Sequence, residues 1–366
     1  MQSSRKISVL QMYMVLMLSI GISNHVLLIP ILLEAAKRDA WVGALASIVP
    51  VALWGFILYV VSRKTRQMAI ADWLEKHYGK VTRRLLEAVI VIYLFVAAYV
   101  SLSDTVTWTN VSYLPRTPKL VIVLFFILLC CFAALAGMRA IAITAGLLLP
   151  AVVLLGDFVA LANTQYKDYA LLTPLFTHGY EPSLRALGYA CCGLFELVLI
   201  VLMQHHVSSQ IRFRGVMIMT LILVGLTTGP LTGSIALFGP FEAAEQRYPA
   251  FEQWRMVTLG KFISHLDFLS IYQWISGSFI RVSLMLFLIP DVTGIKSRKR
   301  RSYTLIGLSV VLLVLALLPF SDAKMLQFLS ALYFPGIFVL NAGFGLLLFA
   351  LTLLPAAKRR GKENAD

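Results

Sequence analysis

The chain has 366 residues, of which 59% are apolar and only 14% are charged, and its formal net charge is +14. About a quarter of the residues of a soluble domain are charged, so this composition excludes an ordinary soluble protein. Clustered Lys and Arg can also indicate nucleic-acid binding, but here the basic residues lie in short segments between apolar stretches. We therefore expect no nucleic-acid partner and attribute the positive charge to membrane topology.

Ten apolar segments follow one another along the chain, each close to the roughly 20 residues that a helix needs to cross the hydrocarbon layer. They cover residues 8–33, 41–61, 85–108, 120–138, 140–162, 184–204, 216–238, 266–289, 303–320 and 329–354. Only residues 137–139 separate the fourth segment from the fifth, and fusing the two would give nine spans and move the C-terminus to the other side. The pattern predicts an all-α integral membrane protein with about ten transmembrane helices, in a single membrane domain over residues 1–366.

Basic residues are distributed unequally between the two ends of these spans. With the N-terminus in the cytoplasm, the cytoplasmic segments hold 21 Lys and Arg residues and the opposite segments hold ten, while Arg281 lies within a span. Positively charged loops are retained on the cytoplasmic side. Both termini are therefore predicted to be cytoplasmic, including a basic tail over residues 356–366.

Ten spans divide into two sets of five, over residues 1–165 and 180–355, and the odd number in each set reverses the orientation of the second. This is the condition for an inverted repeat, in which the first and sixth spans correspond. Small or polar residues lie at the middle of both spans: Gly21, Ser23, Asn24, His25 and Pro30 in the first, and Gly188, Tyr189, Cys191, Cys192, Gly193 and Glu196 in the sixth. Transporters of this plan have discontinuous helices there, which bind substrate through free backbone groups. Because Gly and Pro are common in continuous membrane helices too, the pattern leaves both structures open.

Ionisable residues within spans need an explanation, since one at the bilayer centre costs about 2.5–3.5 kcal/mol on insertion scales. Glu196, near the middle of the sixth span, fits either ligand or proton binding or a buried structural carboxylate. Arg281, in the eighth span, requires an acidic partner that the sequence does not identify. Asp157 either joins Arg281 in a charge relay or lies near a membrane surface, and Asp104 is expected at a solvated helix end.

Aromatic side chains in the third, sixth and eighth spans either line a pocket or pack the bundle. The candidate ligand-binding set is Gly21, Ser23, Asn24, His25, Tyr93, Gly193, Phe195, Glu196 and Trp274. His205 and His206 are adjacent, and residues that share a helix face lie three or four apart, so we predict an ordinary helix end there and no metal site. No nucleophile elbow, phosphate-binding loop or zinc-ligand spacing occurs, and we expect neither enzymatic activity nor a cofactor.

Several short motifs occur in a fixed order over about 270 residues. They are Lys6-Ile7-Ser8 with Gln11, the first span up to Pro30, Asp39-Ala40-Trp41, Phe195-Glu196, and Tyr248-Pro249-Ala250 followed by Arg255, Phe262-Ile263, Asp267 and Trp274. With these motifs the chain resembles the B subunits of spore nutrient germinant receptors, distant members of the amino acid-polyamine-organocation transporter superfamily. The resemblance implies a LeuT-type five-plus-five inverted repeat in the spore inner membrane. It also implies a complex with a larger A subunit and a lipoprotein C subunit, surrounded by membrane lipid, that binds an amino acid or similar small nutrient.

Two positions depart from that family's pattern. Ser23 and His25 stand where the family commonly has Gly-x-Gly, and Leu202 stands where it commonly has proline. Glycine lets a backbone approach a ligand closely, so the larger side chains are expected to shrink or re-polarise the pocket. A proton-coupled amino-acid permease, with Glu196 as the proton carrier, and a membrane scaffold with a degenerate pocket are the alternatives to a germinant receptor.

Overall fold

The computed structural model describes residues 6–258 and 264–354, so the predicted basic tail and the motif residues Phe262 and Ile263 lie outside the described residues. In the described part, nine helices are long and apolar enough to cross a membrane. The first of these, Val9–Lys64, reverses near Lys37, where φ is positive, and therefore contains two of the ten predicted spans. The prediction of about ten membrane-crossing segments is confirmed.

The helices of the two halves follow in chain order. The first half contains α1 (Val9–Ile22), α2 (Ile29–Ala36), α3 (Ala40–Ala46), α4 (Ile48–Lys64), α5 (Ile70–Ser112), α6 (Lys119–Ala136) and α7 (Met138–Ala162). The second contains α8 (Glu181–Leu194), α9 (Leu199–Met203), α10 (Phe213–Phe238), α11 (Pro240–Glu245), α12 (Pro249–Arg255), α13 (Leu269–Val292), α14 (Arg298–Leu317), α15 (Asp322–Phe328) and α16 (Phe334–Leu353).

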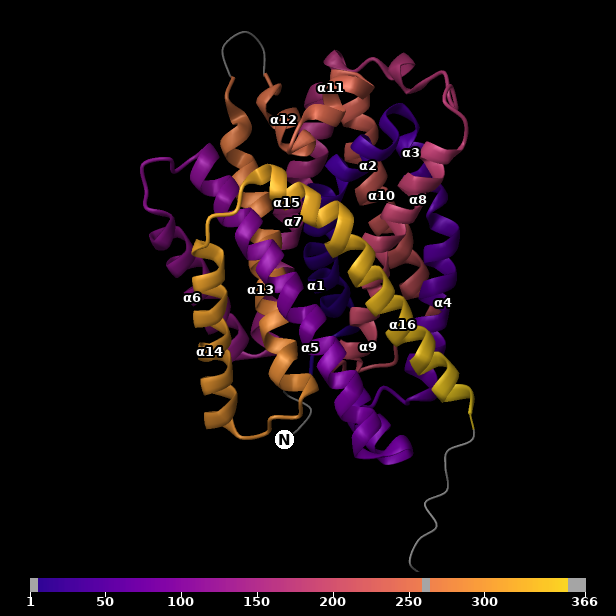
Figure 1. Ribbon diagram of the computed structural model, residues 1–366, viewed down its shortest axis with the longest axis vertical. Coiled ribbons are helices and arrows are strands. Elements are labelled where there is room, and N and C mark those ends of the chain that lie inside the picture. Colours follow the sequence, from indigo (N-terminus) through magenta and orange to yellow (C-terminus); the bar gives the residue numbers. More distant parts are fainter. Residues whose placement is uncertain (1–5, 259–263, 355–366) are drawn as a thin grey trace, which may run out of the picture.

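A single glycine separates the fourth predicted span from the fifth. Gly137 has φ 98° and ψ 176° and ends α6, and α7 begins at the next residue. Only glycine adopts that backbone region readily, so the chain reverses there without a longer loop. The two spans are separate helices, and the described chain begins and ends on the same side of the bundle, which we call the terminal side (Figure 1).

The first and sixth spans are both interrupted at their middle. A π-helical stretch, Ser23–Leu28, joins α1 to α2, and a 3₁₀ turn, Phe195–Val198, joins α8 to α9. Pro30 follows the π-helical stretch, and proline has no N–H to donate and clashes with the carbonyl four residues earlier in a regular α-helix. A second π-helical stretch, Leu329–Tyr333, is likewise followed by a proline, Pro335, at the second position after its end. The predicted discontinuities are present as changes of helix type.

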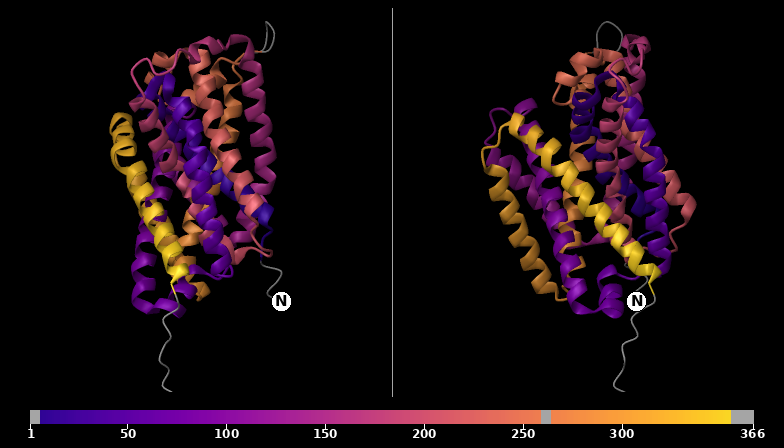
Figure 2. Two further views of the ribbon diagram at one scale, coloured as in Figure 1. Left: turned by 90° about the vertical axis from the view of Figure 1, so that its right-hand side faces the viewer. Right: turned by 45° about the vertical axis from the view of Figure 1, so that its right-hand side comes forward.

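Two of the helices form the centre of the bundle. In the most apolar 18-residue stretch of each helix, 83% of the residues are buried in Leu266–Val292 and 78% in Glu181–His206. The corresponding share in Arg298–Leu317 is 22%. Figure 2 shows α14 and α16 on the outside of the molecule. Large apolar side chains such as Phe132 and Leu147 are exposed on the outer helices, where we expect lipid.

Candidate functional site

The centre of the bundle holds an ion pair between the two most buried helices. Arg281 in α13 and Glu196 in the 3₁₀ turn of the sixth span are both fully buried. The guanidinium Nη1 and Nη2 each donate a hydrogen bond of 2.6 Å to one oxygen of the Glu196 carboxylate. This bidentate geometry is the strong form of an Arg–carboxylate contact. Glu196 is therefore the acidic partner that the sequence requires for Arg281.

The other donors of Arg281 join the pair to three more helical segments. Nε donates to the Ser101 hydroxyl of α5 at 2.8 Å, and Nη1 donates to the Ser19 carbonyl of α1 at 2.9 Å. Nη2 donates to the Tyr333 hydroxyl at 3.2 Å, in the second π-helical stretch. A guanidinium has five N–H donors, and all five have acceptors here. Arg281 thus links the first, third, sixth and tenth spans to the eighth.

A small cavity lies beside this pair, between the first span, α5 and α13. Its lining, which defines the central cavity, consists of Ile22, Ser23, Val26, Leu27, Ser101, Asp104, Thr105, Trp274 and Ser278. About 190 Å³ of space between these side chains is not filled by atoms, and part of it is open to the outside. Ser101 lines the cavity and also accepts a hydrogen bond from Arg281. A molecule bound there would contact Ser101, which is hydrogen-bonded to the central ion pair.

The side of the cavity away from the termini is closed by aromatic and charged side chains. Trp274 stacks on Trp108 with ring centroids 3.9 Å apart, and Tyr248 packs edge-on against Trp274 at 5.0 Å. The Asp104 Oδ1 accepts hydrogen bonds from Arg247 at 2.7 Å and from the Tyr248 hydroxyl at 3.2 Å. Burial raises the pKa of Tyr248 well above its ordinary value, and the negative charge of Asp104 raises it further. The phenol therefore keeps its proton and donates the hydrogen bond to Asp104.

Two predicted ligand-binding residues line the central cavity, and three others lie in the neighbouring parts of the first and sixth spans. Ser23 and Trp274 line it, and the Ser23 hydroxyl is buried without a hydrogen-bond partner among the described residues. Asn24 lies against Gly193, so closely that a side chain at Gly193 would overlap its amide oxygen. Both polar atoms of the Asn24 amide also lack partners within the described chain. Gly21, one turn earlier, is buried near Leu226 of α10 and does not line the cavity.

The remaining candidates lie elsewhere. His25 is half-buried beside the Leu226 backbone of α10. Phe195 stacks on Trp54 with ring centroids 4.6 Å apart, so it packs the sixth span against α4. Tyr93 is 2% exposed and lies near Glu196. None of these three residues lines the central cavity.

Two expectations for the acidic residues need correction. The sequence predicts a solvated helix end for Asp104, but its carboxylate is buried, because Arg247 and Tyr248 fold over it from the connection between α11 and α12. The proposed relay between Asp157 and Arg281 does not form in the described part of the chain. Asp157 is exposed, and the hydrogen bonds of Arg281 all go to other residues.

The prediction that His205 and His206 cannot face one site is also wrong. Their Nε2 atoms lie 3.1 and 3.0 Å from the same oxygen of Asp291, at the end of α13. The prediction assumes α-helical spacing, whereas residues Gln204–His206 form a 3₁₀ turn followed by extended backbone at Val207. The end of the sixth span therefore turns both rings toward α13.

Comparison with known proteins identifies relatives over most of the chain. The profile of a family described as "Spore germination protein" matches residues 6–325. "Spore germination protein XB" of Bacillus anthracis is 40% identical over 344 residues, which cover 94% of this chain and 95% of that protein. "Putative spore germination protein YfkT" of Bacillus subtilis (strain 168) is 23% identical over 278 residues, 74% of each chain.

Solved structures share the fold at low sequence identity. The crystal structure of MhsT in complex with L-phenylalanine superposes with a TM-score of 0.66 at 12% identity, covering 97% of this chain and 94% of that chain. A Na⁺-coupled sialic acid symporter in a substrate-bound, outward-open state gives 0.57 at 11% identity, covering 95% and 79%. These likenesses confirm the predicted LeuT-type transporter fold.

Proposed function

Because this chain belongs to the spore germination protein family and has a transporter-like fold, we propose that it is the B subunit of a nutrient germinant receptor. In this proposal it works in the spore inner membrane with A and C subunits. It binds a small nutrient that carries a cationic group, as amino acids do. The observation that carries the proposal is the Asp104 carboxylate at the wall of the small central cavity.

The chemistry of the cavity supports such a ligand. Asp104 Oδ1 is bonded to Arg247 and Tyr248, while Oδ2 accepts no hydrogen bond within the described residues. A ligand ammonium group can donate to this second oxygen, and the unpartnered Ser23 hydroxyl supplies a further polar contact. A buried polar group without a partner is costly, so a ligand that satisfies the Ser23 hydroxyl gains free energy on binding.

Ligand binding in the cavity can change the conformation of the bundle through the central ion pair. A ligand that displaces Ser101 disturbs the acceptor of Arg281 Nε, and Arg281 holds the first, sixth and tenth spans. Sensing requires only that the ligand bind one conformation better than the other. Movement of those spans relative to α5 and α13 would then reach the partner subunits.

The test is Asp104→Asn, which keeps the size of the side chain and removes its charge. We expect spores with this variant to need at least tenfold more nutrient, or not to germinate with it, relative to the amount of protein present, which is measured as well because Arg247 loses its countercharge. Asp157→Asn is the matched control, because Asp157 is exposed and should leave the response unchanged. A normal nutrient response in the Asp104 variant would show that the ligand site lies elsewhere.

The transporter-like fold favours a proton-coupled amino-acid permease as the second candidate. A proton carrier must release its proton during the cycle, and both Glu196 oxygens are bound to Arg281. We therefore expect negligible amino-acid uptake by the purified protein in liposomes under a proton gradient, while spores that lack it fail to germinate with at least one nutrient. Saturable, gradient-driven uptake that disappears in Glu196→Gln would favour the permease.

A further inference from the structure

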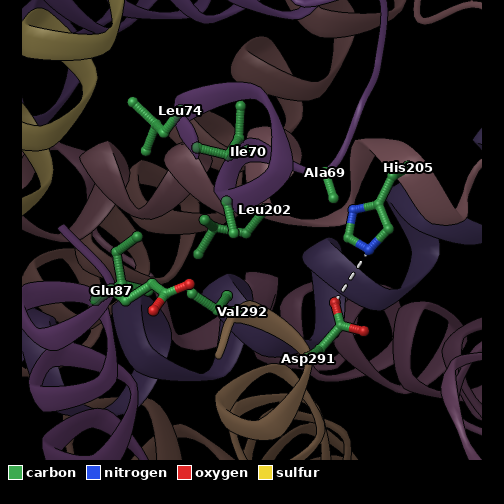
Figure 3. Close-up of a pocket in the computed structure, with 10 residues that line it drawn as sticks. Ala69, Ile70, Leu74, Glu87, Leu202, His205, Asp291 and Val292 are labelled. Atoms are coloured by element: carbon green, nitrogen blue, oxygen red, sulfur yellow. Dashed lines mark ion pairs between the residues drawn. The ribbon is translucent and has the colours of Figure 1, made fainter. Parts of the chain in front are cut away.

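Three potential metal ligands converge on the terminal side of the bundle, away from the central cavity. His205, His206 and Asp291 each offer one ligand atom, and these atoms lie within 4.8 Å of one another. Figure 3 shows His205 facing Asp291 on one side of a second cavity, with Glu87 on the other side and Leu202 drawn between them. The side chains are 12–24% exposed, so the cluster is shielded and still accessible to a small ion.

The backbone holds the two histidines in place from both sides. The His206 carbonyl accepts a hydrogen bond of 2.9 Å from the Ile7 N–H, and Ser208 N–H donates to the Ile7 carbonyl at 2.9 Å. The Gln204 side chain donates to the Thr65 hydroxyl at 3.0 Å and to the Met68 carbonyl at 2.7 Å. The turn that carries the histidines is therefore anchored before and after them, as a preorganised ligand site requires.

The distances of the two imidazole nitrogens from the carboxylate oxygen suit a tetrahedral ion. Zinc–nitrogen bonds of about 2.0 Å place tetrahedral ligands about 3.3 Å apart, and here each imidazole Nε2 lies 3.0–3.1 Å from Asp291 Oδ2. Three protein ligands leave the fourth position open, and two of them, His205 and Asp291, line the second cavity. The other Asp291 oxygen, Oδ1, lies 3.9 Å from Arg301, an outer partner of the kind that orients a ligating carboxylate.

We propose that His205, His206 and Asp291 bind one divalent transition-metal ion of the zinc class. Two imidazoles and one carboxylate form a ligand set typical of zinc and related ions, and this set does not favour Mg²⁺ or Ca²⁺. The ion joins the end of the sixth span to the end of α13. It therefore holds together, on the terminal side, the two elements that Glu196 and Arg281 join at the centre. This inference is independent of the nutrient proposed for the central cavity.

The probe is Co²⁺, which takes the place of Zn²⁺ and has visible ligand-field bands. The full chain, purified in detergent without a polyhistidine tag and stripped with a chelator, is expected to bind one Co²⁺ per chain with tetrahedral-type bands. His205→Asn, His206→Asn and Asp291→Asn should each weaken binding at least tenfold. His178→Asn, at an exposed loop histidine, should bind as the wild type does.

A second measurement uses wild-type protein alone and does not depend on the folding of the variants. X-ray absorption at the metal edge of the Zn²⁺-loaded protein should show two imidazoles and oxygen in the first coordination shell. Fewer than two imidazoles, or no stoichiometric binding of Co²⁺ or Zn²⁺ after chelator stripping, would overturn the proposal. So would unchanged Co²⁺ binding in the three ligand variants.

Discussion

At the scale of single residues, a buried guanidinium in a membrane helix needs both a countercharge and acceptors for its N–H groups. Arg281 obtains the countercharge from Glu196 and the remaining acceptors from three other segments. Removing one member of a buried ion pair leaves the other charge without compensation, which destabilises proteins by about 3–5 kcal/mol. Replacing both members by neutral groups of similar size is often close to neutral.

We therefore expect Glu196→Gln alone, or Arg281→Met alone, to lower the free energy of unfolding by about 3–5 kcal/mol. The double variant should recover most of that loss. The measurement is thermal denaturation of the detergent-solubilised protein, in which the monodisperse fraction is recorded as a function of temperature. Single variants as stable as the wild type would mean that the pair opens to water or to a ligand in the membrane. Any loss of the nutrient response in Glu196→Gln must be compared with this loss of stability.

At the scale of helices, the first and sixth spans meet where each departs from α-helical geometry. Gly193 in α8 packs against Asn24 and Leu28 of the π-helical stretch. The absence of a side chain at Gly193 is what permits this approach, because an added Cβ would overlap both neighbours, at 2.2 Å from Asn24 Oδ1 and 2.9 Å from Leu28 Cδ2. Gly193, which the sequence predicts as a ligand-binding residue, has a packing role in the structure.

Gly193→Ala should destabilise the protein by about 1–3 kcal/mol, the usual cost of overpacking a filled interior. Gly188→Ala, in the same helix, is the matched control, since no heavy atom lies within 4 Å of its added methyl group. Alanine has a higher helix propensity than glycine by about 1 kcal/mol, so the control should be neutral or stabilising. Equal melting temperatures of the two variants would contradict the close packing of the two spans.

At the scale of the whole molecule, the sixth and eighth spans are joined at two levels. Glu196 contacts Arg281 at the centre, and about ten residues later in both helices His205 and His206 contact Asp291. Ten helical residues correspond to about 15 Å, so the two contacts are about half a membrane thickness apart. A conformational change that separates these spans on the terminal side must break the second contact first.

The side of the membrane that each end faces can be tested by cysteine labelling. Lys299→Cys, in the first turn of α14, should react only from the cytoplasm, together with a cysteine at Lys358 in the predicted tail outside the described residues. Lys324→Cys, one crossing later, should react only from the other side. The four native cysteines are buried and should give little background. If cysteines at positions 299 and 324 react from the same side, the chain does not cross the membrane between them. If position 299 reacts only from outside and position 324 only from the cytoplasm, the predicted orientation is reversed.

The sequence by itself determined the membrane class, the ten spans and the need of Arg281 for an acidic partner, and it left open whether the first and sixth spans are interrupted. These properties depend on local composition, because hydrocarbon tolerates only long apolar helices and penalises each isolated charge. The tertiary structure decided which partners meet. Glu196 and Arg281 are 85 residues apart, and Asp104 and Arg247 are 143 apart. No local pattern encodes such contacts, since they depend on how the helices pack. The 3₁₀ turn at Gln204–His206 likewise brings His205 and His206 to Asp291 through backbone geometry that the apolar pattern does not report.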